Sequence, residues 1–306
     1  MTALARLLQR LDLVQPDTDE FYDLGAPDPL PRVFGGQVAA QALAAMGRTV
    51  PAARPVHSLH VRFVGTVHPA EPLHLRVARV KEGRAFDVRE VAVRQCGRIV
   101  LTASASFQKP EPGDDFHRPA PPLRNPDELP RWESRFAGRT DRLTPLWRRS
   151  RPLDVRFEEP PAALDHELTH QPRPGQRLWV RADGPLPEDP LLHACLLVYA
   201  SDLTLLETAV LPHGVVWSDG RYRGASLDHT MWFYRPLRLD EWLCFDQQAE
   251  FTGGARGLAS GRFLRADGDP VATVVQEGLL RPTHGRPTWL GNTAPHPEEL
   301  SVEDRT

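Results

Sequence analysis

The sequence predicts an α+β fold made of two similar halves, each an antiparallel sheet wrapped around one central helix. The passage from His57 to Gln108 is echoed by that from Asp228 to Leu279, at a displacement of 171 positions, and apolar runs fall on apolar runs. Gly97 then falls on Gly268. In both halves a helical apolar stripe precedes a series of alternating segments. A passage of this length that occurs twice indicates a duplicated domain and excludes a solenoid.

The first half is expected to open with a helix that begins near positions 34–37. Four apolar residues recur at the spacing of a helix buried along one face: Val38, Ala42, Ala45 and Met46. Apolar and polar residues then alternate within 59–63, 73–77, 86–88 and 99–103. Alternation with a period of two predicts the strands of a half-buried antiparallel sheet.

The second half repeats this order. A strand is expected at 176–182, followed by a helix in which Asp189 is the N-cap and Pro190 the first helical residue. The buried stripe of this helix would comprise Leu192, Cys195, Leu196 and Tyr199. Strands are predicted again at 225–233, 242–250, 256–263 and 270–280.

The distribution of proline divides the chain. Just over half of its 31 prolines lie between Pro110 and Pro190, where long regular elements are therefore not expected. Large aromatic residues in the same stretch, Trp132, Trp147 and Phe157, suggest a strap packed over the domains rather than a solvated linker. The expected organisation is an N-terminal domain (1–109), a Pro-rich connecting segment (110–174), a C-terminal domain (175–285) and a polar tail (286–306).

Composition limits the class of partner. The chain has 306 residues, 41% of them hydrophobic, and a net charge of −3, so its overall field attracts neither nucleic acid nor an anionic membrane surface.

The cysteines, Cys96, Cys195 and Cys244, are far apart and lie in apolar stretches, which indicates buried thiols rather than disulfides or a zinc cluster. We expect no membrane span, because no apolar run approaches the roughly 18 residues that a span needs. We expect a cytoplasmic protein that acts on a small molecule without a metal or other cofactor.

Polar residues at three places in the second half are candidates for chemistry. Asp202 lies three residues beyond Tyr199, so it would share the buried stripe if the helix persists that far. Ser226 belongs to a strand in which polar and apolar residues alternate, and Gln276 ends an apolar run. The pattern alone favours solvent exposure for all three side chains, because a buried amide or carboxylate needs hydrogen-bond partners.

Six ordered blocks of sequence resemble the type II acyl-CoA thioesterase family, the TesB-like double-hotdog enzymes. They are RVFGGQVAAQAL (32–43), PVHSLH (55–60), TASASFQ (102–108), YASDLTLL (199–206), GASLDHTMWFYRP (224–236) and TVVQEGLLRP (273–282). The resemblance implies a hotdog fold in each half, hydrolysis of acyl-CoA in fatty acid and lipid metabolism, and a homo-oligomer. It also implies that an acid, a hydroxyl and an amide hold a water, and by motif these are Asp202, Ser226 and Gln276.

The chemistry of a thioester agrees with these residue types. Its carbonyl is reactive enough for direct attack by a positioned water, provided that a base accepts the proton and donors meet the oxyanion. Asp202 is expected to be the base or the principal orienter of the water, and Ser226 and Gln276 are expected to fix the water by hydrogen bonds.

Substrate-binding groups are expected in the first half. The backbone N–H groups of Gly35, Gly36 and Gln37, at the start of a helix, are candidates for polarising the carbonyl. His57 in the PVHSLH block is a further candidate, with an ordinary surface or core position as its alternative. The family commonly carries an aromatic residue and a Leu-Arg-Pro-Gly-like turn after this block, whereas this chain reads VRFVGTVHP (61–69). Chain-length preference is therefore not carried over.

Several rival interpretations remain open. The run His166-Glu167-Leu168-Thr169-His170 is a formal zinc-protease motif, but it would need a helix and a third ligand between Pro161 and Pro172. A double-hotdog protein could also bind acyl thioesters without cleaving them, or could cleave acyl groups from a carrier protein instead of coenzyme A. An enoyl-thioester hydratase would require an Asp-x-Asn-Pro-x-His block, which the sequence lacks.

Overall fold

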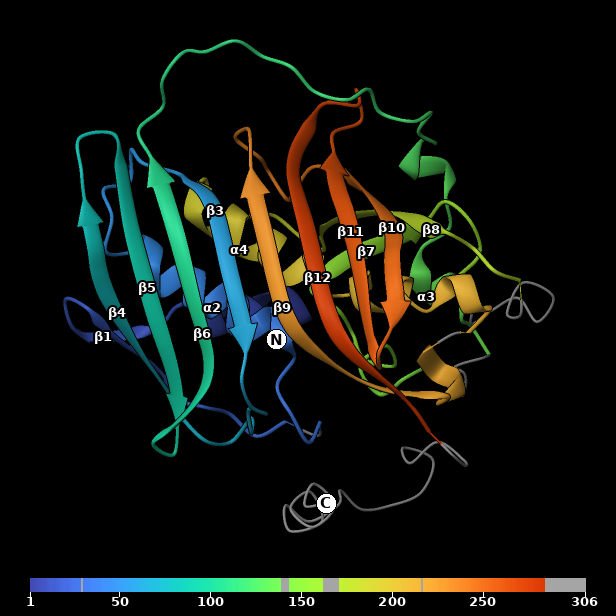
Figure 1. Cartoon of the computed structure of the whole chain (residues 1–306), viewed down its shortest axis with the longest axis horizontal. Helices are drawn as coiled ribbons and strands as arrows, with labels where there is room; N and C mark the ends of the chain where they lie inside the picture. Colours follow the sequence, from blue (N-terminus) through green and yellow to red (C-terminus); the bar gives the residue numbers. More distant parts are fainter. Residues whose placement is uncertain (29, 139–142, 162–170, 216, 284–306) are drawn as a thin grey trace.

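The computed structural model describes residues 1–28, 30–138, 143–161, 171–215 and 217–283. Within these residues twelve strands form one antiparallel sheet (Figure 1). Their spatial order is β1 (Val14–Asp17), β2 (Glu20–Asp23), β4 (Leu73–Glu82), β5 (Phe86–Gln95), β6 (Arg98–Gln108), β3 (Val56–Phe63), β9 (Tyr222–Phe233), β12 (Pro270–Pro282), β11 (Arg256–Leu264), β10 (Leu243–Gly253), β8 (Gly175–Ala182) and β7 (Leu153–Phe157).

This strand order is symmetric about the centre of the sheet, because each strand of the first half is as far from the centre as its repeat in the second half. β3 and β9 lie at the centre, and the succession β6, β5, β4, β2, β1 on one side mirrors β12, β11, β10, β8, β7 on the other. Gly97 and Gly268 both adopt positive φ, at 78° and 92°, in equivalent turns. The duplication predicted from the 171-residue displacement is thus visible in the topology.

The two expected sheets are continuous with one another. β3 and β9 pair antiparallel, from Ser58 opposite Trp232 to Arg62 opposite Asp228. Each strand would otherwise be an edge with unpaired backbone groups, and their pairing satisfies both edges at once. β7, which lies inside the predicted connecting segment, also joins this sheet through β8.

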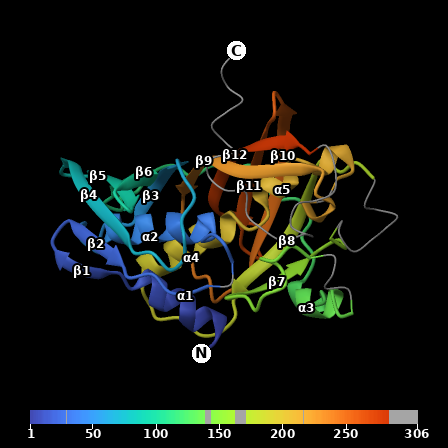
Figure 2. The same cartoon turned by 90° about the horizontal axis from the view of Figure 1, so that it is seen from below.

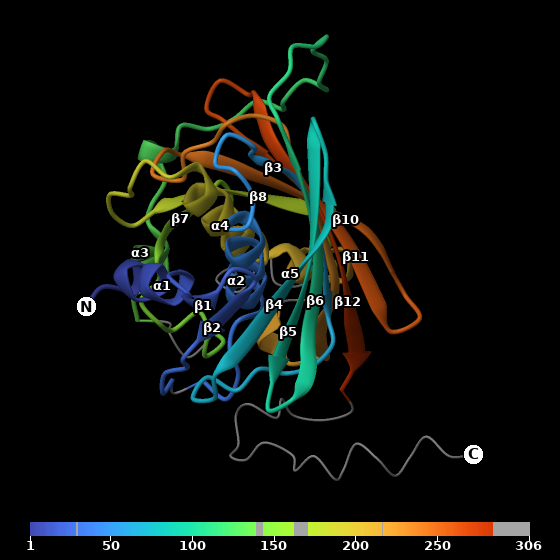
Figure 3. The same ribbon diagram turned by 90° about the vertical axis from the view of Figure 1, so that its left-hand side faces the viewer.

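Two helices fill the concave side of the sheet, as Figures 2 and 3 show. They are α2 (Gly35–Gly47) and α4 (Pro190–Ser201), and they pack directly against each other. The N-cap predicted for α4 is confirmed, because the Asp189 side chain accepts a hydrogen bond of 2.9 Å from the Leu191 amide. Shorter helices, α1 (Ala3–Leu11), α3 (Trp132–Arg135) and α5 (Leu205–Thr208), lie around this pair.

The central helices are apolar on almost every face. The prediction that no apolar run approaches the length of a membrane span is wrong for Pro190–His213, which is long and apolar enough by composition. Its most apolar window is 78% buried inside the fold, however. A helix surrounded by sheet and by another helix needs no polar stripe, which accounts for this composition.

The Pro-rich stretch packs against the second half. Trp132, Trp147 and Phe157 are buried together with Phe136, and the guanidinium of Arg151 lies 3.8 Å from the Trp147 ring centroid.

The prediction for the cysteines is confirmed for Cys195 and Cys244, which are buried, and wrong for Cys96, which is exposed. Cys96 precedes Gly97 in the turn between β5 and β6, where a side chain has no core to enter.

Truncation of Leu43, which is fully buried at the centre of α2, should lower the free energy of unfolding by about 2–5 kcal/mol, because Leu43→Ala leaves a cavity between helix and sheet. Val80 on β4 is 56% exposed, and Val80→Ala should change stability by less than about 0.5 kcal/mol. Equilibrium unfolding in urea measures both, and equal losses would contradict the assignment of the core.

Candidate active site

The carboxylate of Asp202 lies where the end of α4 meets the start of α2. α4 ends at Ser201 and Asp202 is its C-cap, so the residue stays on the side of the helix that faces α2 and the sheet. A Cβ at Gly35 would lie 2.9 Å from Asp202 Oδ2, and one at Gly36 would lie 2.9 Å from the Tyr199 carbonyl oxygen. Glycine at both positions is therefore what allows the first turn of α2 to reach this carboxylate.

The three side chains predicted to hold a water are in mutual contact. Gln276 Nε2 donates to Asp202 Oδ1 at 2.6 Å and also lies 2.8 Å from Ser226 Oγ. Ser226 Oγ donates to the same carboxylate oxygen at 3.4 Å. The backbone amide of Gly36 bonds the Asp202 carboxylate as well. Residues that lie 24 and 50 positions apart along the chain thus converge on one oxygen-rich point.

Burial makes Asp202 a weaker acid than an ordinary aspartic acid. Desolvation raises its pKa to about 6, although the hydrogen bonds from Gln276, Gly36 and Ser226 act in the opposite direction. The positive end of the α2 dipole also favours the charged form. The result is a carboxylate that is ionised at neutral pH and still basic enough to accept a proton from water.

A β-bulge turns Ser226 towards this site. In the register of β9 and β12, Asp228 lies opposite Glu277 and Ser226 lies opposite Gly278, so Leu227 is an extra residue. Strict alternation would have put Ser226 on the same face as Asp228, whose carboxylate pairs with Arg62 at 3.3 Å on the exposed side. The bulge brings Ser226 to the opposite face, beside Gln276.

Gln276 is fully buried, which corrects the exposed position that the pattern alone favoured. It lies directly opposite His229 in the antiparallel register, and antiparallel partners share a face of the sheet. His229 is 1% exposed, and burial lowers its pKa to about 4. Sequence reasoning did not select this histidine. The register between the GASLDHTMWFYRP and TVVQEGLLRP blocks is the feature that identifies it.

Of the three predicted backbone donors, Gly36 bonds the Asp202 carboxylate and Gly35 lies beside it. The amide of Gln37 instead bonds the Phe34 carbonyl oxygen at 3.1 Å inside the helix. Aromatic rings enclose this corner, since Phe34 packs edge-on against Tyr199 with centroids 5.1 Å apart. Sequence reasoning also missed this aromatic wall.

His57 lies away from the other candidates. Its Nε2 is 2.7 Å from Ser106 Oγ, its ring packs edge-on against Phe86, and burial lowers its pKa. The pairing of β3 with β9 puts His57 and Ser226 at opposite ends of the seam, roughly 20 Å apart at about 3.3 Å per residue. The substrate-binding role expected of His57 stays a prediction without a contact to the trio.

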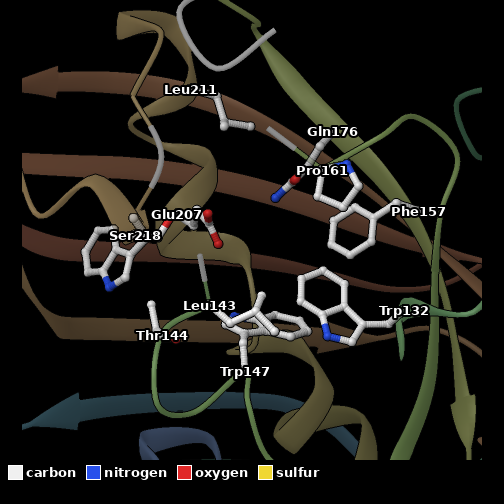
Figure 4. A pocket seen from close by; sticks show the side chains of 11 residues that line it. Trp132, Leu143, Thr144, Trp147, Phe157, Pro161, Gln176, Glu207, Leu211 and Ser218 are labelled. Atoms are coloured by element: carbon white, nitrogen blue, oxygen red, sulfur yellow. The ribbon is translucent and has the colours of Figure 1, made fainter. Parts of the chain in front are cut away.

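A small, partly open pocket lies between the Pro-rich stretch and the second half (Figure 4). Its apolar lining includes Trp132, Leu143, Trp147, Leu211 and Trp217, and the polar side chains of Gln176 and Glu207 lie among them. The Trp217 ring packs directly against Gly224, where a side chain would not fit, since a β-carbon there would lie 1.9 Å from the ring. Gly224 and Ser226 share a face of β9, and Trp217, which lines the pocket, lies against that face at Gly224.

Within the part of the chain that the structure describes, no three His, Cys, Asp or Glu side chains cluster closely enough to hold a metal ion. The motif from His166 to His170 lies outside the described residues.

Comparisons with known proteins agree across most of the chain. Residues 148–279 match a family model described as acyl-CoA thioesterase, and residues 26–108 match one described as acyl-CoA thioesterase N-terminal domain. Acyl-coenzyme A thioesterase 8 of Rattus norvegicus is 35% identical over 82% of this chain and 80% of its own length. Acyl-CoA thioesterase 2 of Haemophilus influenzae is 32% identical over 86% of this chain and 91% of its own.

Solved structures show a similar fold. The crystal structure of an acyl-CoA thioesterase II, TesB2, from Mycobacterium marinum has a TM-score of 0.75 and 36% identity, and the match covers 91% of this chain and 99% of that one. A protein of unknown function with a hot dog fold from Alicyclobacillus acidocaldarius has a TM-score of 0.72 at 19% identity, over 91% and 99% of the two chains.

The raised pKa of Asp202 should make stability depend on pH. Its folded pKa of about 6 lies above the ordinary value of 3.8 that it has in the unfolded chain, so protonation favours the folded state. The free energy of unfolding should therefore rise, by at most about 3 kcal/mol, as the pH falls from about 6 to about 4. Asp202→Asn should lack this increment, whereas Asp228→Asn on the exposed face should retain it. Urea unfolding at several pH values tests this, and identical profiles for all three proteins would refute the burial argument.

Proposed function

The chain belongs to the acyl-CoA thioesterase family, whose members hydrolyse acyl-CoA to a carboxylic acid and coenzyme A, and on that premise we propose that Asp202, Ser226 and Gln276 form its hydrolytic site. The observation that carries the proposal is the convergence of the Gln276 amide and the Ser226 hydroxyl on Asp202 Oδ1. A carboxylate with a pKa of about 6 and two neighbouring polar groups can orient a water and accept its proton.

The proposed reaction needs no covalent enzyme intermediate. Asp202 accepts a proton as the water oxygen bonds to the thioester carbonyl carbon, and a tetrahedral oxyanion forms. Its collapse breaks the carbon–sulfur bond, and coenzyme A departs as a thiolate, a good leaving group because thiols have a pKa near 8.5. The proton on Asp202 passes to the thiolate or to solvent, which restores the carboxylate.

The amide of Gly35 is the candidate that remains for stabilising the oxyanion. Gly36 bonds Asp202, and Gln37 bonds Phe34 within the helix. An N–H group in the first turn of a helix points along the axis and carries the positive end of the dipole, so it favours a developing negative charge.

We further propose that the fold is a double hotdog. The mirrored strand order, one central helix in each half and the similarity to a hot dog fold support this description. On this view β3 and β9 form the junction between two hotdog units, and only the second unit carries the polar trio.

The acyl group is proposed to occupy the aromatic pocket beside Trp217. Most of its lining is apolar, and Trp217 in that lining lies against Gly224, on the same face of β9 as Ser226, so a chain whose carbonyl reaches the trio could extend into it. The Pro-rich stretch supplies Trp132, Leu143 and Trp147 to this wall and would thereby influence which acyl groups fit.

Replacement of the proposed base tests the function directly. Asp202→Asn should lower kcat by about a hundredfold or more, because the amide cannot accept the proton from water. Release of the coenzyme A thiol, followed with a thiol-reactive dye, measures the rate. Asp228→Asn, on the exposed face of the same strand as Ser226, should keep nearly full activity. If wild-type protein binds acyl-CoA without releasing thiol, it is a binding protein instead.

The pocket assignment predicts opposite effects from two changes at one residue. Leu143 is buried in the wall, so Leu143→Ala should raise the ratio of kcat/KM for long over short acyl chains several-fold, and Leu143→Phe should lower it. A panel of acyl-CoAs of increasing length measures the ratio. Phe116→Ala, at a side chain that is 92% exposed, is the control. An unchanged ratio in both Leu143 variants would remove the pocket from substrate binding.

A further inference from the structure

We propose that His229 is a positioning residue that holds the Gln276 side chain with its nitrogen towards Asp202 and Ser226. The inference rests on the proposed hydrolytic role of the trio and adds a fourth member to it. Gln276 is useful to the trio in only one of the two orientations of its amide, because Asp202 and the water need a donor there rather than a second oxygen.

The contact between the two side chains is built into the sheet. His229 and Gln276 lie opposite each other in the register of β9 and β12, and both are almost completely buried. His229 Nδ1 and Gln276 Oε1 are buried and have no hydrogen-bond partner within normal geometry among the residues that the structure describes, although the two side chains interact. A buried donor and a buried acceptor would each be costly alone, so their natural arrangement is a bond between them.

The other ring nitrogen connects His229 to the end of α4. His229 Nε2 lies 2.8 Å from the Oγ of Ser201, the residue immediately before Asp202. When Nδ1 carries the proton, it donates to Gln276 Oε1, and Nε2 accepts from the Ser201 hydroxyl, which then turns from the Val198 carbonyl oxygen that lies 2.8 Å from it. The amide nitrogen of Gln276 is then directed at Asp202 Oδ1 and Ser226 Oγ, where its bonds measure 2.6 and 2.8 Å.

The reversed amide is disfavoured beside Asp202 and, in the Nδ1–H tautomer, beside His229 as well. Its oxygen would stand 2.6 Å from the Asp202 carboxylate oxygen, in the place where the nitrogen now donates. With Nδ1 protonated, its nitrogen would also face a second donor, and only the tautomer with the proton on Nε2 would accept it. Burial keeps His229 neutral, with a pKa of about 4, so the imidazole acts through the choice of tautomer and not through its charge.

The first half of the chain serves as an internal control. There, Leu59 lies opposite Ala105 as His229 lies opposite Gln276, and a bulge between Val56 and Ser58 matches the one between Ser226 and Asp228. By strand register, Val56, Leu59 and Ala105 thus stand at the positions of Ser226, His229 and Gln276. The offset is 170 positions between β3 and β9 (229 − 59) and 171 between β6 and β12 (276 − 105). The scaffold accepts a fully buried leucine at the histidine position, so packing alone does not require the imidazole.

Two substitutions separate positioning from packing. His229→Leu, which installs the residue of the first half, should lower kcat at least about tenfold with little change in KM, because the amide loses its orienting donor. His229→Asn keeps a side-chain N–H near the position of Nδ1 and should recover most of the activity. Met231→Leu, at a buried residue on the same face of β9, is the control for disturbance of the core.

The dependence of kcat/KM on pH distinguishes positioning from packing, because a residue that only packs would leave it unchanged. With Gln276 free to turn, Asp202 loses a donor and its pKa should rise, so the acid limb of kcat/KM against pH should move above about 6 in His229→Leu and return in His229→Asn. In a Gln276→Ala background, His229→Leu should cause no further loss of kcat.

Distinct outcomes overturn the two proposals. Additive losses in the double variant, or an acid limb that stays in place in His229→Leu, would refute the positioning role while leaving the trio intact. Full activity of Gln276→Ala would instead refute the hydrolytic site itself.

Discussion

The site depends on one close contact, the approach of the first turn of α2 to the carboxylate at the end of α4. A carboxylate removed from water is expensive unless donors replace its hydration. Gly35 and Gly36 let the backbone come near enough to supply one such donor and the positive end of a helix dipole. Gln276 and Ser226 supply the others, from two strands that the sheet already holds side by side. The remaining desolvation leaves the carboxylate basic.

The duplication explains how such a site can exist within a stable core. Both halves have the same strands, the same bulge beside the seam and one buried helix, so most of the architecture is fixed by burial of apolar faces. In the first half the equivalent positions are filled by Val56, Leu59 and Ala105, which only pack. In the second half polar groups take those positions, and each of them requires partners. The first half instead contributes the glycine-rich turn.

Much of this fold could be predicted from the sequence, because its signals are local. Alternation in the strands, the Asp189-Pro190 helix start and the displacement of 171 positions depend on neighbouring residues or on simple repetition. The trio was reached through resemblance, since the pattern alone favoured an exposed Gln276. The inward turn of Ser226 depends on the bulge at Leu227, and a bulge is a property of two paired strands. The union of the two sheets, the partnership of His229 and the exposure of Cys96 likewise depend on tertiary pairing or turn position.

The distribution of the site across the β3–β9 seam makes it depend on both units of the chain. The glycine turn that touches Asp202 comes from one unit, and the acid, hydroxyl and amide come from the other. Neither unit alone holds both parts of the site, because each has only one of the two central helices. Since both units belong to one polypeptide, the contact between them is intramolecular, and its formation does not depend on protein concentration.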